Sequence, residues 1–432
     1  MSVAGIICEF DPIHTGHAYL MEQARGAGAE AVVCAMSGSF TQRGGFAVAD
    51  KLARAEMAVR CGADLVLELP TVWAMSTAER FAQGGVDILT RTGVVTELVF
   101  GSECGDLAGL RRAADCLEGP EFTASLASLP EDGRTFAARR QAALAALLGA
   151  EEAALLASPN NTLAVEYLRA IRRLESPLTA RTVRRTGAQH GEEASGGFAS
   201  ASYLRQLLAA GEPEQAAAYM PPAAAEILRR ELAAGRIADG TLCERAILSR
   251  LRAMTAEDWR RFDGGGEGLG NRLYQASRTG STLEAVLAVA KTKRYPMARL
   301  RRMVLAAWLD LPAPPARAPY LRVLAAAKTK RYPMARLRRM VLAAWLDLPA
   351  PPERAPYLRV LAANDTGRRL LRQMRDAGAP VLTKPADVSL LGAEAEALFA
   401  VESRCTDLYV LARPDPAQMT PGQEWRMTPV MR

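Results

Sequence analysis

Histidine is scarce in this sequence, and long apolar runs are missing. Only three of the 432 residues are histidine, and aromatic residues make up 6%. No window approaches the roughly 20 apolar residues that a membrane span needs, and the N-terminus lacks a basic segment followed by a long apolar stretch. We therefore expect a cytoplasmic protein with no membrane segment.

Paired cysteines and the common phosphate-binding signatures are missing too. The seven cysteines are scattered singly without a C-x-x-C pair, which predicts small buried side chains in a reducing compartment rather than a metal site. No G-x-x-x-x-G-K-[ST] occurs, so the chain is not a P-loop protein. The glycine-rich stretch at 264–272 does not satisfy G-x-G-x-x-G and follows no predicted strand, so it is interpreted as a turn and a helix start.

The sequence does contain a regular alternation of strand and helix patterns. Buried apolar runs at 3–10, 31–36, 64–69 and 97–103 are separated by helical patterns that end in glycine. This β-α-β-α-β-α-β order predicts a parallel sheet covered by helices on both faces.

The pattern changes in the second half of the chain. A further strand and loop are expected at 177–190, and from about residue 214 the apolar spacing becomes helical. We therefore predict an α/β, Rossmann-like domain at residues 1–213, followed by a mostly α-helical domain at residues 214–432.

Positive charge is concentrated in a segment that occurs twice. Residues 290–326 recur at 327–363 with a single change, Ala316 against Glu353. Each copy holds eight Lys or Arg, and together the copies carry +13, so the rest of the chain carries −6 of the net +7. Solenoid repeats normally number three or more and diverge, so two near-identical copies indicate a recent tandem duplication or an error of sequence assembly.

Two of the three histidines stand close together just after the first predicted strand, in "EFDPIHTGH". A strand, a short loop and a helix N-terminus place backbone N–H groups and the helix dipole against a phosphate. Gly16 allows a close backbone approach, and His14 and His17 can then stabilise the charge that develops at the α- and β-phosphates. A structural histidine pair and half of a zinc site are the alternatives, although no third ligand stands at a suitable spacing.

Several stretches resemble one known family. "GIICEFDPIHTGH" resembles the HxGH signature of the nucleotidylyltransferase superfamily. "MSGSFTQRGGFAVADKLARAEMAVRCGADLVLELP", "VFGSECGDL", "SPNNTLAVEYL", "FASASYLRQ", "PYLRVLAAN", "PVLTK" and "TDLYVLA" resemble, in the same order, the bacterial tRNA(Met) cytidine acetate ligase family. The similarity runs from residue 3 to about residue 412. The chain departs from the family pattern at Gly45, where an acidic residue is usual, and at Leu52, where a tryptophan is usual.

The resemblance implies a reaction and a set of partners. Family members activate acetate with ATP, with Mg²⁺ accompanying the nucleotide, to form acetyl-adenylate and pyrophosphate. They then transfer the acetyl group to the exocyclic amine of the wobble cytidine of elongator tRNA(Met). The first 213 residues would accordingly form a nucleotidyltransferase domain, and the basic helical domain would bind tRNA.

The resemblance also implies which residues form the site. His14 and His17 would be catalytic. The residues implied in ATP binding are Ile7, Cys8, Glu9, Phe10, Asp11, Pro12, Ile13, His14, Thr15, Gly16, His17, Ala18, Tyr19, Leu20, Gly101, Asn161, Arg185, Ser200, Ser202 and Arg205.

The ATP-binding candidates that follow the first loop also have simpler structural interpretations. Gly101 could serve only strand-end packing, and Arg185 could be a solvated surface charge. Asn161 could be the N-cap of the helix that follows it, and the serines of "SASYLR" could cap a helix. Arg43 and Lys51 follow another strand end and could hold acetate, pyrophosphate or the tRNA backbone, or could be merely exposed charges.

The basic repeat is the predicted tRNA contact. "KTKRYPMARLRRM" places arginines on adjoining helix faces, with Tyr295 and Tyr332 as candidates for base stacking. Leu300, Met303 and Val304 are expected to pack in a core on a different face. The predicted tRNA contacts are Arg299, Arg301, Arg302, Arg336, Arg338 and Arg339.

Two other functions fit the residues. An HxGH adenylyl- or cytidylyltransferase acting on a small phosphorylated metabolite would use the same loop, but would not need a large basic helical half. A non-catalytic RNA-binding protein would not need both histidines.

Overall fold

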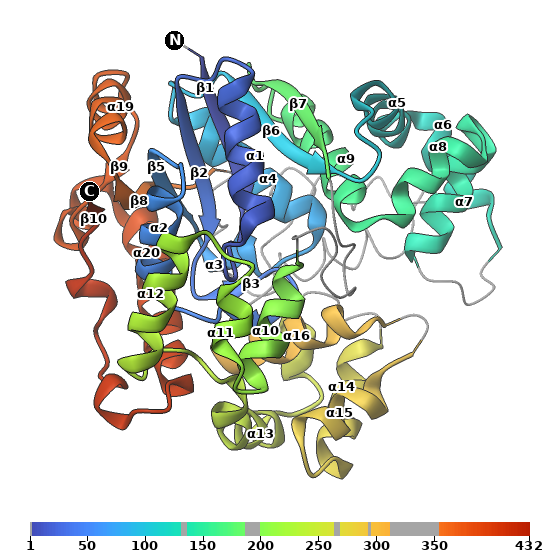
Figure 1. The fold of residues 1–432 in the computed structure, drawn as a ribbon. Coiled ribbons are helices and arrows are strands. Elements are labelled where there is room, and N and C mark those ends of the chain that lie inside the picture. The colour runs from blue at the N-terminus through green and yellow to red at the C-terminus, as the bar shows by residue number, and fades with distance from the viewer. Residues whose placement is uncertain (1, 131–135, 186–198, 263–267, 293–294, 312–353) are drawn as a thin grey trace.

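A single large sheet lies at the centre of the molecule in the computed structural model, which describes residues 2–130, 136–185, 199–262, 268–292, 295–311 and 354–432 (Figure 1). Its strand order is β10-β8-β5-β2-β1-β6-β7, with β9 paired to β8. The five strands that the first half of the chain contributes to this sheet are mutually parallel, which confirms the predicted α/β class. They are β1 Val3–Cys8, β2 Ala31–Ser37, β5 Leu65–Leu69, β6 Glu97–Ser102 and β7 Thr179–Arg184.

The C-terminal half is not wholly helical, because it completes one edge of this sheet. Strand β8 (Leu358–Ala363) pairs antiparallel with β5 and parallel with β10 (Val430–Met431) and β9 (Val381–Leu382). All six residues of β8 are buried; five are apolar, and the sixth, Arg359, pairs with the buried Glu424. The boundary expected near residue 214 stays a prediction.

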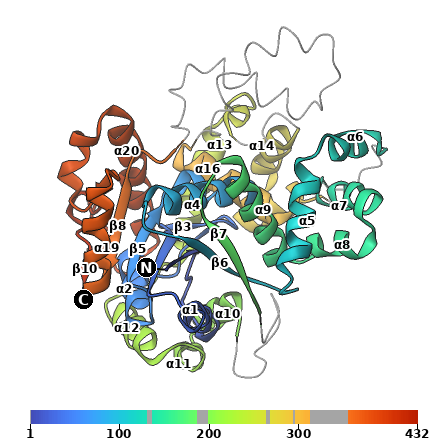
Figure 2. The ribbon, with the colours of Figure 1, turned by 90° about the horizontal axis from the view of Figure 1, so that it is seen from above.

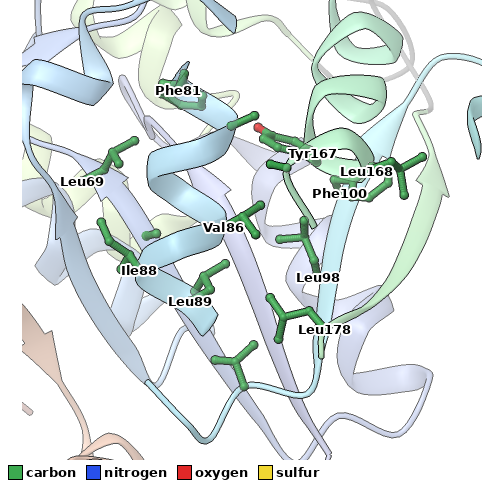
Figure 3. Packing of buried hydrophobic residues seen from close by; sticks show 14 of the residues in the cluster. Leu69, Phe81, Val86, Ile88, Leu89, Leu98, Phe100, Tyr167, Leu168 and Leu178 are labelled. Atoms are coloured by element: carbon green, nitrogen blue, oxygen red, sulfur yellow. The ribbon is translucent and has the colours of Figure 1, made fainter. Parts of the chain in front are cut away.

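Helices cover both faces of the sheet and bury two apolar clusters against it (Figure 2). One face carries α4 (Ala78–Arg91), α5 (Leu107–Glu118) and α9 (Pro159–Arg173). Figure 3 shows Val86 and Leu89 of α4 in the cluster that also holds Leu98 of β6. The other face carries α1 (Thr15–Gly26), α2 (Lys51–Arg60), α10 (Ala201–Ala209), α11 (Pro213–Ala217) and α12 (Pro222–Ala233).

The remaining helices form two outlying groups and an edge layer (Figure 1). A lobe beside α5 contains α6 (Pro120–Ser128), α7 (Phe136–Leu148) and α8 (Ala150–Ala154). A third apolar cluster, with Trp259 fully buried, joins α13 (Glu244–Ala253), α14 (Leu269–Thr279), α15 (Leu283–Ala290) and α16 (Met297–Leu309). Near the sheet edge lie α3 (Thr71–Ala74), α19 (Asp365–Asp376) and α20 (Ala393–Tyr409). None of the helices in the described part of the chain combines the length and apolar character that a bilayer crossing needs.

The duplicated segment contributes to the structure from both copies. Helix α16 comes from the first copy, whereas β8 comes from the end of the second. The intervening residues 312–353 lie outside the described part of the chain. As expected, Leu300, Met303 and Val304 of α16 are buried.

Candidate active site

The candidate site lies at the carboxyl end of β1, where the strand order reverses. The chain proceeds from β1 to β2 and β5 on one side, then crosses back to β6 and β7 on the other. Ligands in open α/β sheets bind in the crevice at such a point. A two-stranded hairpin, β3 (Phe40–Thr41) and β4 (Gly45–Phe46), follows β2 beside this edge.

His14 and His17 form the turn between β1 and α1. His14 is the N-cap of the helix: its Nδ1 accepts the N–H of Gly16 at 3.1 Å, and its own N–H donates to Nδ1 of His17 at 3.3 Å. The ring centroids are 3.8 Å apart, and Phe10 meets the His17 ring edge-on at 5.0 Å. With both Nδ1 atoms accepting, the Nε2–H group of each neutral ring is its hydrogen-bond donor.

Both rings are neutral in this environment. Burial, with a further contribution from the Arg185 charge, lowers the pKa of His14 to about 3. Burial lowers the pKa of His17 well below its usual value as well, and the neighbouring His14 and Arg185 add to the effect. The pair therefore offers hydrogen-bond donors rather than positive charge until an anion arrives.

Residues predicted from three later motifs meet on the β6 side of this turn. Gly101 is in β6, and a side chain there would crowd the Arg185 side chain at 3.1 Å. The backbone N–H of Arg185 donates to the carbonyl of Ser102 at 2.9 Å. Burial lowers the pKa of the Arg185 guanidinium, although Glu103 acts in the opposite direction. Arg185 itself is exposed to solvent, and its charge acts on both histidine rings.

Asn161 joins the same group, but not as a helix cap. The N-cap of α9 is Ser158, and Asn161 lies inside the first turn with 3% of its surface exposed. Its Oδ1 accepts the N–H groups of Glu103 at 3.0 Å and Cys104 at 3.2 Å. Asn161 thus fixes the loop that follows β6.

Sequence reasoning missed Glu103 and Asn160 in this loop. One carboxylate oxygen of Glu103 accepts from the backbone N–H and Nδ2 of Asn160, and the other accepts the N–H of Asn161 at 2.8 Å. The Glu103 carboxylate therefore occupies the positive end of α9. The acidic residue directly after a predicted strand in "FGSE" was the available signal.

Ser200, Ser202 and Arg205 begin α10 on the other side of the turn. Ser200 caps the helix, because its Oγ accepts the N–H of Tyr203, so the capping interpretation holds for this residue. Ser202 lies 3.3 Å from it, oxygen to oxygen. Arg205 donates from Nη1 to the carbonyl of Asp11 at 2.6 Å and pairs with its carboxylate at 3.3 Å. These contacts bring the helix start to the histidine loop.

Arg43 stands at the tip of the hairpin, exposed to solvent, whereas Lys51 does not reach the loop. Lys51 is 1% exposed, and its ammonium group lies 2.6 Å from Glu68 and 2.8 Å from Glu424. Burial alone would lower the pKa of Lys51, but the carboxylates of Glu424 and Glu68 raise it. The structure thus separates two residues that the sequence grouped together.

The predicted tRNA contacts are described only for the first copy of the repeat. Arg301 is exposed on α16, Arg299 lies over the ring of Tyr295 at 5.5 Å, and Arg302 donates to the carbonyl of Gln42 at 3.1 Å. Tyr295 is buried in the core of the helical group, so the expectation that it is available for base stacking is wrong. Arg336, Arg338, Arg339 and Tyr332 lie outside the described residues.

Comparisons with known proteins identify the family of this chain. The family described as HIGH Nucleotidyl Transferase matches residues 1–327 and 316–424. The tRNA(Met) cytidine acetate ligase of Syntrophomonas wolfei is 39% identical over 313 residues, covering 71% of this chain and 75% of that protein. The protein of the same name from Acetivibrio thermocellus is 37% identical, covering 71% and 76%.

A solved structure extends the similarity to the full chain. The crystal structure of Thermotoga maritima TmcAL bound with alpha-thio ATP superposes with a TM-score of 0.85 at 28% identity, covering 100% of this chain and 99% of that one. Relatives at this identity and coverage establish the family. The chain therefore belongs to the tRNA(Met) cytidine acetate ligase family.

Proposed function

We propose that this protein activates acetate with ATP and transfers the acetyl group to the exocyclic amine of the wobble cytidine in elongator tRNA(Met), giving N4-acetylcytidine. The observation that carries this proposal is the convergence of His14, His17 and Arg185 at the strand-order reversal. The relatives named above bear the name of this reaction, and one neighbour's structure holds an ATP analogue.

In the first step, an acetate oxygen attacks the α-phosphorus and pyrophosphate leaves. Negative charge accumulates on the phosphate oxygens, and the Nε2–H donors of His14 and His17 are placed to stabilise it. Because both rings are neutral before ATP binds, the nucleotide's own charge raises their pKa and strengthens these hydrogen bonds. Arg185 supplies a positive charge from the β6 side.

Mg²⁺ accompanies the nucleotide in this proposal. Within the described ranges no cluster of three or more His, Cys, Asp or Glu could hold a metal ion. Mg²⁺ is commonly held by substrate phosphates and water with few protein ligands, so this donor set fits an ion that arrives with ATP. When bound, the ion neutralises phosphate charge.

The second step requires that water be kept from the intermediate and that the protein bind the tRNA. Acetyl-adenylate hydrolyses readily, so water must be kept from it until cytidine arrives. A wobble base must also be splayed from its loop to enter a pocket. We assign tRNA binding to the basic helix α16, whose Arg301 is exposed and which contacts the hairpin through Arg302.

Exchange of labelled pyrophosphate into ATP, measured with and without acetate and tRNA, tests the proposal. Acetate-dependent exchange is the expected result. Exchange with a phosphorylated metabolite but none with acetate would favour the small-metabolite nucleotidyltransferase. Tight tRNA binding without any exchange would favour the binding protein.

A further inference from the structure

Glu9 directly follows β1 and holds its carboxylate on the side of the turn away from Gly101 and Asn161. One oxygen, Oε1, accepts the backbone N–H of Gln42 at 2.6 Å, and Gln42 belongs to the hairpin after β2. The side chain is half-buried. Although Glu9 belongs to the loop implied in ATP binding, its carboxylate therefore lies on the β2 side of the histidine turn, opposite Gly101 and Asn161 on the β6 side.

The surroundings of Glu9 make it a stronger base than an ordinary carboxylate. Burial raises the pKa of Glu9, and the neighbouring Asp11 charge raises it further. The N–H of Gln42 and the cations Arg205 and Arg43 act in the opposite direction without cancelling the effect. Tyr167 of α9 also faces Glu9, but burial raises the pKa of its phenol, so it stays neutral.

The hairpin that holds Glu9 is docked on the basic helix. Arg302 of α16 donates to the carbonyl of Gln42, the same residue whose N–H holds Glu9. Gly44, with a φ of +74°, packs against the backbone of Arg301 and Arg302, and no side chain would fit there. A tRNA held by α16 therefore approaches the crevice from the hairpin side, where Glu9 stands.

We propose that Glu9 is the general base of the acetyl-transfer step, an inference that rests on the function proposed above. The amine nitrogen of cytidine attacks the acetyl carbonyl carbon, and a new N–C bond forms. The C–O bond to the adenylate breaks, and AMP leaves with the bonding electrons. One proton of the amine passes to the Glu9 carboxylate, which returns it to solvent.

The chemistry of the acceptor explains why such a base is needed. The exocyclic amine of cytidine is conjugated with the ring, so its nitrogen becomes a good nucleophile only as a proton is removed. A placed general base contributes about 10²–10⁴-fold to such a step. His14 and His17 are committed to the phosphates and, with both Nδ1 atoms already accepting, are poor proton acceptors.

Glu9→Gln separates the two half-reactions. The amide oxygen can still accept from Gln42, but the side chain cannot take a proton. In this variant we expect the rate of single-turnover acetyl transfer to tRNA to fall much more than the rate of acetate-dependent exchange. The fold-loss in transfer should exceed the fold-loss in exchange by a factor of about 10² or more. Trapping of the activated acetyl group by hydroxylamine, a nucleophile that needs no base, should follow the exchange rate. Glu22→Gln, the same chemical change on the exposed face of α1, is the matched control and should alter neither rate.

The pH profile and a conservative variant supply independent tests. The wild-type transfer rate should rise with pH as the Glu9 carboxyl loses its proton, around its raised pKa, and should then stay constant. In Glu9→Gln this rise with pH should be absent. Glu9→Asp should recover part of the rate together with the rise. Equal losses in exchange and transfer, or no loss in transfer, would overturn the assignment. A wild-type protein without acetate-dependent exchange would instead refute the proposed function.

Discussion

Two groups of polar side chains lie at the same edge of the sheet, and they are built in opposite ways. On the β1–β6 side, His14 and His17 use one ring nitrogen each to fix the turn and keep the other as a donor. On the β5–β8 side, the Lys51 ammonium group bonds to both Glu68 and Glu424. The first group is arranged to meet a ligand, whereas the second already has its partners.

The second group is a buried ion cluster that ties the C-terminal region to the sheet. Arg359 of β8 pairs with Glu424 at 3.1 Å and lies 3.8 Å from Glu68. Glu402 accepts from the backbone and hydroxyl of Thr71, and burial raises its pKa to about 8. Near neutral pH Glu402 therefore keeps its proton, so two cations face two carboxylates. Charge alone does not mark a ligand site; the difference lies in whether the protein itself supplies the counter-ion.

The largest expected effect is on stability. Lys51→Met leaves the two buried carboxylates of Glu68 and Glu424 with only one remaining cation, Arg359. One buried charge then lacks a counter-ion, and breaking a buried pair in this way costs about 3–5 kcal/mol. Denaturant unfolding should show this loss. Arg60 lies on the same helix as Lys51, and its ion pair with Glu226 of α12 is exposed to solvent. Arg60→Gln breaks that pair and serves as the control, which should lose much less stability. Unchanged stability with a raised KM for acetate would place Lys51 in the substrate site after all.

The histidine pair should show the converse pattern, with a large effect on rate and a small one on stability. His17→Asn keeps an acceptor for the His14 N–H but removes the ring donor. Loss of one such donor costs about 10²–10³-fold in kcat, here for acetate-dependent exchange. The unfolding midpoint should stay close to the wild-type value. A variant that exchanges at the wild-type rate would show that the ring does not act on the phosphates.

The contrast also explains what could be predicted from the sequence. The strand, the glycine and both histidines fall within one short stretch, so local pattern and spacing were enough to predict the turn and its helix. One of the two partners of Lys51, Glu424, stands 373 residues along the chain, so no local pattern could pair them. Strand β8 was missed for a related reason: "LRVLAA" lies in a basic repeat, and only its pairing with β5 makes it a strand. Both the Lys51–Glu424 pair and strand β8 form only when distant segments of the chain meet, so neither could be predicted from a local pattern.

A third expected effect concerns pH. Folded His14 has a pKa of about 3, against about 6.5 in an unfolded chain, so below pH 6.5 the unfolded state binds a proton that the folded state excludes. The free energy of unfolding should therefore fall as pH drops, with His14 contributing about 2 kcal/mol of the loss at pH 5. Denaturant unfolding at pH 7.5 and pH 5 measures this loss. In His14→Asn the free energy of unfolding should fall by about 2 kcal/mol less between these two pH values than in the wild-type protein. Identical pH dependence in the two proteins would mean that His14 is already charged in the fold.

The smallest expected effect is spread over the basic helix. Arg299→Gln and Arg301→Gln, made together with Arg336→Gln and Arg338→Gln in the second copy, should weaken tRNA binding. Each lost phosphate contact should also reduce the salt slope of binding by about 1. Arg302 is left in place because it holds the hairpin. Arg369→Gln and Arg372→Gln remove the same kind of charge from the exposed face of α19 at the sheet edge and serve as the control. If both sets lower the slope equally, binding reflects overall charge. If only the first set does, α16 and its repeat form the tRNA surface beside the hairpin and the histidine turn.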